Sequence, residues 1–226
     1  MRRFLKDNGL SLVVLALFLV TLAGQSVAGF LEYNQGQREH GEPTVRYGEY
    51  LGTGHFTESV FENWESEFLQ MGLYVFLTVF LVQRGSAESK KPEDELEEGP
   101  EEIDEDPAEH RHDPDAPWPV RRGGLVLKLY EYSLSLAFLL LFLVSFAGHA
   151  VGGAMEYNAE QTEHGGEPVS VLGYVATARF WFESLQNWQS EFLAVASIVL
   201  LSVWLRQRGS PESKPVHAPM GQTGNS

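Results

Sequence analysis

Two long apolar runs restrict what this chain can fold into. Residues 10–31 form a stretch of 22 residues without a charge, and residues 134–155 form a second stretch in which His149 is the only ionisable side chain. A run of about 20 apolar residues can cross the hydrocarbon core of a membrane as a helix. Residues 68–82 and 192–205 are shorter, but each reaches a full span if the turn before it lies among the lipid headgroups. The sequence therefore predicts four transmembrane helices.

The apolar segments belong to a pattern that occurs twice. The block Glu-Tyr-Asn at residues 32–34 returns at 156–158, an offset of 124. This predicts a tandem duplication, with a first repeat over residues 1–84 and a second over 125–209. Because each repeat has two spans, the copies have the same orientation and are parallel repeats about an axis along the membrane normal. The expected fold class is an all-α integral membrane four-helix bundle.

The start of the chain also fits a secretory signal peptide. Arg2 and Arg3 precede the first apolar run, and Ser26-Val27-Ala28 resembles a cleavage site. The same small-residue pattern recurs within the third apolar segment, where a signal peptidase does not act. We therefore expect the first helix to be retained.

The net charge of -15 is unevenly distributed along the chain. Residues 93–115 hold 13 acidic residues and one arginine, and the segments 32–67 and 156–191 together hold 14 acidic residues against three arginines. The remaining 12 basic residues, against only four acidic ones, lie near the ends of the apolar segments. Lys and Arg near helix ends mark the cytoplasmic side. We therefore expect a protein of the cell (inner) membrane with both termini and the linker in the cytoplasm.

Two segments are predicted to be disordered. Residues 85–124 are rich in Glu, Asp, Pro, Ser and Gly and bury too little apolar surface to offset the entropy of folding. They are interpreted as an acidic linker that joins the two repeats. The polar tail, residues 210–226, is expected to be mobile.

Small and polar residues recur along one face of the first and third spans. Spacings of three and four place them on one side of a helix, and small residues there let helix backbones approach closely in lipid. They are Thr21, Gln25, Ala28, Gly29 and Glu32 in the first copy and Ser145, His149, Gly152, Gly153 and Glu156 in the second. Helix packing alone is one explanation of this pattern, and a functional role for this face is the other.

A polar loop is expected after Asn34, and a further helix is expected to begin near Gly54. Its apolar side is formed by Phe56, Phe61, Trp64 and Phe68, and its other sides carry Glu58, Glu62 and Glu65. Such a segment lies in the membrane interface before the chain enters the membrane.

The candidate site consists of ten polar residues expected at or near the outer face. If the first and third helices are central, Glu32 and Glu156 face one another, with His149 about two turns deeper. Carboxylates and imidazoles suit Zn, Mn or Fe, so a divalent cation could bind there, although no HExxH or Glu-x-x-His spacing occurs. Surface histidines without a metal are the alternative. The ten residues are Gln25, Glu32, Asn34, His40, Glu67, His149, Glu156, Asn158, His164 and Glu191.

Four short blocks occur in both copies: EYN, EHGEP (EHGGEP in the second copy), NW-x-SEFL and QRGS-x-ESK. Together they resemble a family of bacterial membrane proteins that is known only as a domain of unknown function. The resemblance covers nearly the whole chain. It implies an integral membrane protein and supplies no catalytic or binding residues.

Several classes of function lack support in the sequence. The chain has no cysteine, which excludes thiolate catalysis, thiolate metal sites and disulfides. No glycine-rich phosphate loop, nucleophile elbow or basic nucleic-acid patch is present. We therefore expect no enzymatic activity, no cofactor and no nucleic-acid partner. The expected contacts are membrane lipid and, as an open alternative, a second copy of the chain in a homo-oligomer.

Two functional hypotheses remain. The first is a non-enzymatic structural or interaction module with a polar outer face. The alternative is a small transporter or channel for protons or cations, lined by Gln25, His149 and the duplicated glutamates, because ionisable residues within a span are usually functional. We expect His149 to be neutral and hydrogen-bonded to Gln25, and the change His149→Gln to be tolerated.

Overall fold

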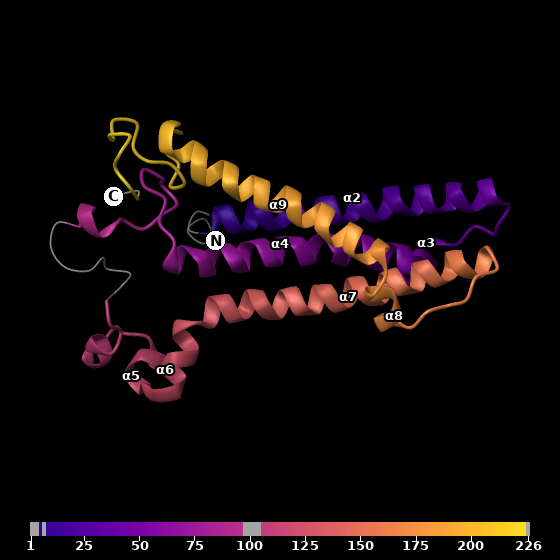
Figure 1. The fold of residues 1–226 in the computed structure, drawn as a ribbon, viewed down its shortest axis with the longest axis horizontal. Coiled ribbons are helices and arrows are strands. Elements are labelled where there is room, and N and C mark those ends of the chain that lie inside the picture. The colour runs from indigo at the N-terminus through magenta and orange to yellow at the C-terminus, as the bar shows by residue number, and fades with distance from the viewer. Residues whose placement is uncertain (1–4, 6–7, 97–104, 225–226) are drawn as a thin grey trace. The chain divides into compact units, whose positions relative to one another are not determined.

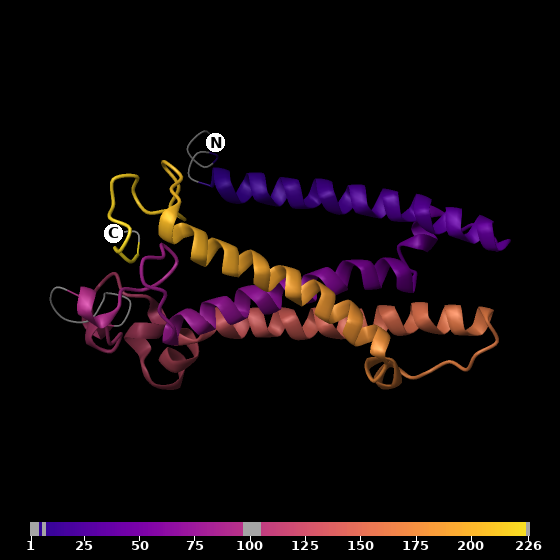
Figure 2. The same cartoon turned by 45° about the horizontal axis from the view of Figure 1, so that its top comes forward.

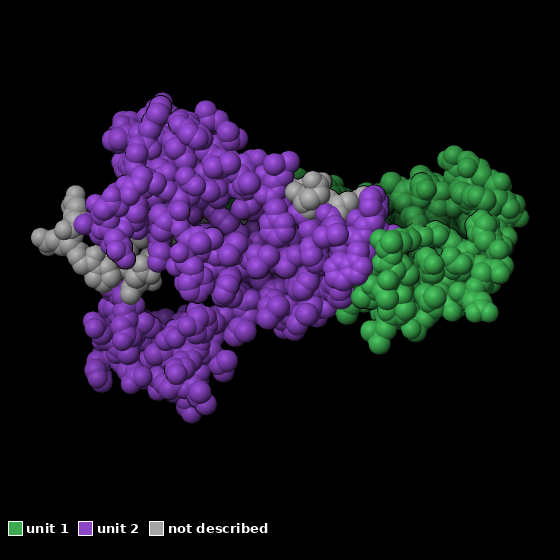
Figure 3. Space-filling view, viewed as in Figure 1, with its two compact units in different colours: residues 1–61, 147–180 green, residues 62–146, 181–226 purple. Residues whose placement is uncertain are grey.

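The computed structural model describes residues 5, 8–96 and 105–224, and every regular element within them is a helix (Figure 1). The chain divides into two compact units, which Figure 3 shows in different colours. Unit 1 comprises residues 1–61 and 147–180, and unit 2 comprises residues 62–146 and 181–226. Predictions for the extreme N-terminus, the middle of the linker and the last two residues concern 1–4, 6–7, 97–104 and 225–226, which lie outside the described residues.

Unit 1 contains two arrangements in which a long helix is followed by a short one. In the first, α2 (Gly9–His40) leads to α3 (Tyr47–Tyr50). In the second, the later part of α7 (Ser133–Glu163) leads to α8 (Val171–Val175). The unit also includes the first residues of α4 (Gly54–Phe80) and of α9 (Ala178–Trp204). The start of α4 at Gly54 confirms the helix predicted there.

Both long helices extend further than the sequence predicts. A polar loop is expected after Asn34, but α2 continues to His40, and α7 continues to Glu163. The first helix stops at Gly41, which has a φ of 78° and donates its N–H to the Arg38 carbonyl. Glycine adopts this left-handed conformation without steric cost and so ends a helix, whereas the polar residues before it are compatible with continued helix.

Unit 2 contains the remainder of α4, α7 and α9 together with the linker and the tail (Figure 2). Its short helices are η1 (Glu93–Glu95), η3 (Glu109–His112), α5 (Trp118–Arg122) and α6 (Gly124–Glu131). The last of these is capped by Tyr132, and α7 begins at the next residue. The disorder of residues 85–124 and 210–226 stays a prediction.

Among the described residues, two helices are long and apolar enough to cross a membrane. They are Leu12–His40, within α2, and Ser133–Glu163, which is α7. The apolar part of α9, Glu191–Trp204, is shorter. Length and apolar composition therefore identify two of the four predicted spans. The helices α4 and α9 do not qualify, because they begin with turns that carry glutamate and asparagine.

The compact units do not coincide with the predicted repeats. Unit 1 combines α2 and α3, from the first predicted repeat, with α7 and α8, from the second. Each neighbour covers only part of the polar or small-residue face of a long helix. Neighbours from both halves of the chain are therefore needed to cover the whole face. The fold is consequently built from segments that are distant in sequence.

Candidate functional site

The same packing contact occurs twice in unit 1, 124 residues apart. Tyr50 and Tyr174, from α3 and α8, are completely buried. A Cβ atom on Gly29 would lie 2.2 Å from the Tyr50 hydroxyl, and one on Gly153 would lie 2.5 Å from the Tyr174 ring. The sequence predicts that these glycines let helix backbones approach. Instead, each glycine leaves room for the tyrosine of the loop that follows its helix.

Asn34 and Asn158 hold these loops in place. The Asn34 side chain donates to the Val45 carbonyl at 3.1 Å and accepts from the Val45 N–H at 2.8 Å. Asn158 makes the same two bonds to Val169, at 2.9 and 2.7 Å. Both candidate asparagines therefore satisfy loop backbone groups, which is a structural role and not that of a ligand.

The two candidate histidines of the loops lie at helix ends. The Nδ1 atom of His40 is 2.9 Å from the Gly36 carbonyl oxygen, and that of His164 is 2.8 Å from the Glu160 carbonyl oxygen. Both side chains are exposed. They bond to their own helix one turn back, so the structure does not gather them with the candidate glutamates.

Glu32 and Glu156 both lie near His55, a residue that the sequence analysis did not select. The His55 Nε2 atom is 3.4 Å from the Glu32 carboxylate, whose side chain is 72% exposed. The His55 backbone N–H bonds to the Glu156 carboxylate, which is half-buried. Burial of Tyr50, and then the charges of Glu32 and Glu156, raise the pKa of the Tyr50 hydroxyl. At this end of unit 1, two carboxylates therefore lie close to His55 and to a buried tyrosine.

Three glycines bring α4 and α7 into close contact in unit 1. A Cβ atom on Gly54 would lie 2.6 Å from the Glu156 backbone nitrogen, and one on Gly152 would lie 2.6 Å from the Glu58 backbone nitrogen. A Cβ atom on Gly148 would lie 2.5 Å from the Phe61 ring. Gly148 and Gly152 form the GxxxG pattern seen in the sequence, and here they do permit close helix packing.

This close packing places a carboxylate beside the buried histidine of α7. Glu58 of α4 is 8% exposed and His149 of α7 is completely buried. Their potential ligand atoms lie within 4.8 Å of one another. The Tyr174 hydroxyl donates to Glu58 Oε1 at 3.1 Å, and the His149 ring stacks on Phe180 with a centroid distance of 4.7 Å. A carboxylate, an imidazole and a phenol are therefore held together in a dry site, where they can share a proton or provide ligands for a divalent cation.

The first copy does not reproduce this cluster. At the offset of 124, Gln25 corresponds to His149 and Phe182 corresponds to Glu58. The Gln25 amide donates to the Ser59 carbonyl at 3.2 Å, so the predicted bond from Gln25 to His149 is wrong. The reason is geometric, because α4 presents its backbone to Gln25 and its carboxylate to His149.

Unit 2 contains the other two candidate glutamates, Glu67 and Glu191, which lie close enough for their charges to interact. Glu67 is exposed, and the Glu191 backbone carbonyl accepts a bond from Gln70 at 3.4 Å. Two other glutamates of α4 are more enclosed. Glu65 is completely buried and accepts from Trp188 Nε1 at 3.1 Å, and the Asn187 amide donates to Glu62 at 2.6 Å.

The sequence analysis therefore missed Glu58, Glu62 and Glu65. They follow one another at spacings of four and three, which places them on one face of α4. The sequence analysis located these residues on the sides of the helix away from its aromatic residues. It did not recognise that an acidic face can also be buried against a neighbouring helix. The spacing was the signal that could have found them.

The QRGS-x-ESK blocks form the same turn twice in unit 2. The Gln83 N–H donates to the Ser89 hydroxyl at 2.9 Å, and the Gln207 N–H donates to the Ser213 hydroxyl at 2.8 Å. Ser86 and Ser210 accept equivalent bonds, each at 3.1 Å, from the N–H two residues on. These serines therefore stop α4 and α9 and reverse the chain.

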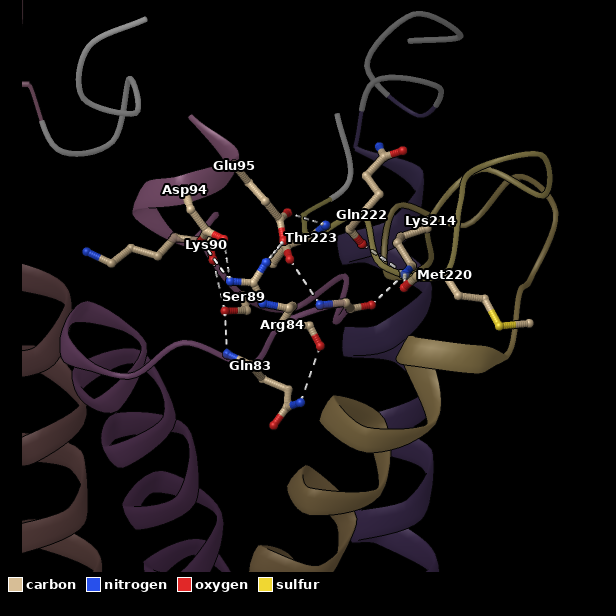
Figure 4. Close-up of polar contacts among 11 residues, drawn as sticks. Gln83, Arg84, Ser89, Lys90, Asp94, Glu95, Lys214, Met220, Gln222 and Thr223 are labelled. Carbon is tan, nitrogen blue, oxygen red and sulfur yellow. Dashed lines mark hydrogen bonds and ion pairs between the residues drawn. The ribbon is translucent and has the colours of Figure 1, made fainter. Parts of the chain in front are cut away.

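Lys214, the last residue of the second block, is buried in this region (Figure 4). Its ammonium group donates to three carbonyl oxygens, those of Gly85 at 2.5 Å and of Met220 and Gln222 at 2.9 Å each. Burial, followed by the charge of Arg206, lowers the pKa of Lys214. The Thr223 hydroxyl also accepts from the Gly85 N–H at 2.9 Å. These contacts fix the described part of the tail against the turn that follows α4.

Residues 1–225 match the family described as Domain of unknown function (DUF6766). The chain belongs to this family. No match was found among the curated proteins or among the solved structures. The family covers the cluster of Glu58, His149 and Tyr174 as well as the tail, and its description assigns no activity to either.

Proposed function

We propose that this member of the family is an integral protein of the cell membrane with four spans, built from two tandem copies, with both termini and the linker in the cytoplasm. The apolar side chains of α2 and α7 support this proposal. Leu10, Val20 and Leu140 are each more than 60% exposed. Such a surface suits lipid tails, whereas a soluble protein would cover it. The basic flanks of the apolar segments support the orientation.

We infer that the protein binds a proton or a divalent cation within the membrane, at Glu58 and His149. The observation that carries this function is that both side chains are buried within 4.8 Å of one another. Ionisable groups in a membrane interior are costly and usually mark a pathway for ions or protons. The Tyr174 hydroxyl, which donates to Glu58, stabilises the carboxylate so that it can exchange a proton with the imidazole.

A proton or cation site of this kind supports the class of small transporters or channels, with a different set of residues along the path than the sequence predicts. Glu32 and Glu67 are exposed and Gln25 bonds to a backbone carbonyl. They therefore contribute less than Glu58, which the sequence analysis did not include. No reaction is proposed, because no nucleophile or cofactor-binding motif accompanies the cluster.

The structural or interaction module, which the sequence analysis gave as the first hypothesis, becomes the second candidate. The duplicated bonds of Asn34 and Asn158, and the tyrosines that pack on Gly29 and Gly153, support it. These residues organise the loops and leave no ligand position. An outer face of this kind could recognise a partner without any ion entering the bundle.

Flux measurements in liposomes test the first candidate against the second. The purified chain is reconstituted with a pH-sensitive dye or a divalent-cation dye inside the vesicles, and a gradient of protons, Mn²⁺ or Zn²⁺ is applied. We expect flux that Glu58→Gln or His149→Gln reduces by about tenfold or more, the scale of losing one principal ligand or proton-transfer group. Glu67→Gln, at an exposed carboxylate, is the matched control and should keep the flux. Wild-type vesicles without flux of any of these ions would favour the structural module.

A further inference from the structure

An apolar groove runs between α4 and α7 in unit 2. It has a volume of about 350 Å³ and is lined on one side by α4, from Phe68 to Phe76, and on the other by residues from Tyr132 to Phe142. A Cβ atom on Gly72 would lie 3.0 Å from the Phe138 side chain, so the two helices nearly touch at the floor of the groove. The lining is apolar apart from the hydroxyls of Tyr132 and Ser135. An occupant must therefore be a hydrocarbon along most of its length.

The length of the groove matches half of a membrane. Tyr132 and Phe142 are ten residues apart, which corresponds to about 15 Å along a helix. The hydrocarbon core of a bilayer is about 30 Å thick, so one leaflet occupies about 15 Å. The chain of α4 runs along the groove in the opposite direction to α7. Phe76, near the end of α4, and Phe68, eight residues earlier, both line the groove. The groove therefore suits a single acyl chain that extends from one surface of the membrane to its midplane.

The end of the groove at Tyr132 is next to a basic amphipathic segment. Tyr132 caps α6, and α5 and α6 lie together at the start of α7 (Figure 1). Arg121, Arg122 and Lys128 of this segment are exposed, against the single acidic residue Glu131.

The same segment also exposes apolar side chains. Leu125 and Leu129 are 79% and 64% exposed, and the Arg122 guanidinium lies 5.4 Å from the centre of the exposed Trp118 ring. Exposed leucine and tryptophan beside Lys and Arg are typical of a helix in the headgroup region. The groove therefore opens where positive charge meets the lipid headgroups.

We propose that this groove holds one acyl chain of an anionic phospholipid from the cytoplasmic leaflet, whose phosphate is held by Arg121, Arg122 and Lys128. The proposal rests on the membrane location given above but not on the cation site, because none of these residues belongs to the cluster of Glu58 and His149. A bound lipid would cover the apolar walls that α4 and α7 present to the groove. The three cations select an anionic headgroup over a zwitterionic one.

Lipid retention by the full chain tests this proposal. The protein is purified in detergent, mixed with equal amounts of phosphatidylglycerol and phosphatidylcholine that have the same acyl chains, and examined by native mass spectrometry. We expect one phosphatidylglycerol to remain bound in preference to phosphatidylcholine. Leu139→Trp, which fills the groove, should reduce retention about tenfold, the loss expected when about two methylene groups are no longer buried. Leu140→Trp is the matched control, because Leu140 is exposed on α7 outside the groove.

The headgroup contact has its own variants. Each of Arg121→Gln, Arg122→Gln and Lys128→Gln should reduce the preference for phosphatidylglycerol about fivefold, and Arg208→Gln, at an exposed arginine of another turn, should leave it unchanged. Equal retention of both lipids, equal effects of the two tryptophan variants, or a mass equal to two chains with no lipid would each overturn the proposal. Loss of ion flux with lipid retention intact would instead count against the cation site alone.

Discussion

The two loops of unit 1 share their tyrosine packing and their asparagine bonds, whereas the helix interiors below them differ. Tyr50 packs on Gly29 and Tyr174 packs on Gly153, and each loop is held by two bonds from an asparagine. Four residues before each of these glycines, one helix has an exposed Gln25 and the other has a fully buried His149. The comparison separates residues that build the repeated fold from residues that give one copy its own chemistry.

The two turns of unit 2 also share local bonds but differ in their tertiary contacts. The QRGS-x-ESK blocks make equivalent bonds within themselves. Only the second block contributes a fully buried lysine, Lys214, while the corresponding Lys90 is half-buried. A duplicated motif can thus fix the same local turn twice and still have one tertiary role that is not duplicated.

Removing the loop tyrosines should have the largest effect on stability. It tests whether Tyr50 and Tyr174 are equivalent in the two loops. Tyr174→Ala and Tyr50→Ala each leave a cavity over a glycine, and large aromatic-to-alanine changes in a core typically cost about 3–5 kcal/mol. We expect similar falls in the midpoint of thermal unfolding in detergent. Tyr130→Ala, at an exposed tyrosine of α6, is the control. A cost for one loop tyrosine near that of the control would break the equivalence.

The buried lysine distinguishes the two turns. Lys214→Met keeps the length of the side chain but leaves three carbonyl groups without their donor, at a cost of about 2 kcal/mol for local opening. Hydrogen exchange of the tail amides, such as that of Thr223, should report this opening. Lys90→Met should change exchange much less. Equal effects would mean that both lysines hold the tail.

The two glycines should differ in their tolerance of a methyl group. At Gly153, three atoms of the Tyr174 ring and hydroxyl lie within 2.7 Å of an added Cβ, whereas at Gly29 only the Tyr50 hydroxyl lies closer than 3 Å. The hydroxyl end of a side chain can shift more readily than a ring. We therefore expect Gly153→Ala to cost about 1–2 kcal/mol by overpacking and Gly29→Ala to cost less. Thermal unfolding in detergent measures both costs. A larger cost at Gly29 would contradict the expectation that Tyr174 packs more tightly on its glycine than Tyr50 does.

The smallest expected effect is the alkaline titration of Tyr50. Burial and the nearby carboxylates of Glu32 and Glu156 raise its pKa above 10.0, so the folded protein holds this proton more tightly than the unfolded chain. Its contribution to stability is therefore complete below about pH 10 and is lost as the pH rises through the raised pKa. Tyr50 is not the only tyrosine that ionises late, so ultraviolet titration of tyrosinate should show several late-ionising groups, and Tyr50→Phe should remove one of them. Tyr130→Phe, at an exposed tyrosine, is the control and should leave the late-ionising groups in place.

The sequence by itself determined the all-helical class, the start of α4 at Gly54 and the positions at which contacts are duplicated. These features depend on local properties, namely apolar runs and the recurrence of short blocks at a fixed offset. It misplaced the ends of α2 and α7, because polar residues after Asn34 are as compatible with an exposed helix as with a loop. A left-handed Gly41 decided the outcome for the first of these helices.

Only the tertiary structure decided which polar residues meet. Glu58 and His149 are 91 positions apart, and the spacing of residues on a helix indicates a shared face but not the neighbour that this face contacts. Their encounter depends on Gly54, Gly148 and Gly152, which let α4 and α7 approach until the side chains between them meet. The same limit applies to Lys214, whose three carbonyl partners come from a turn and a tail that no sequence period connects.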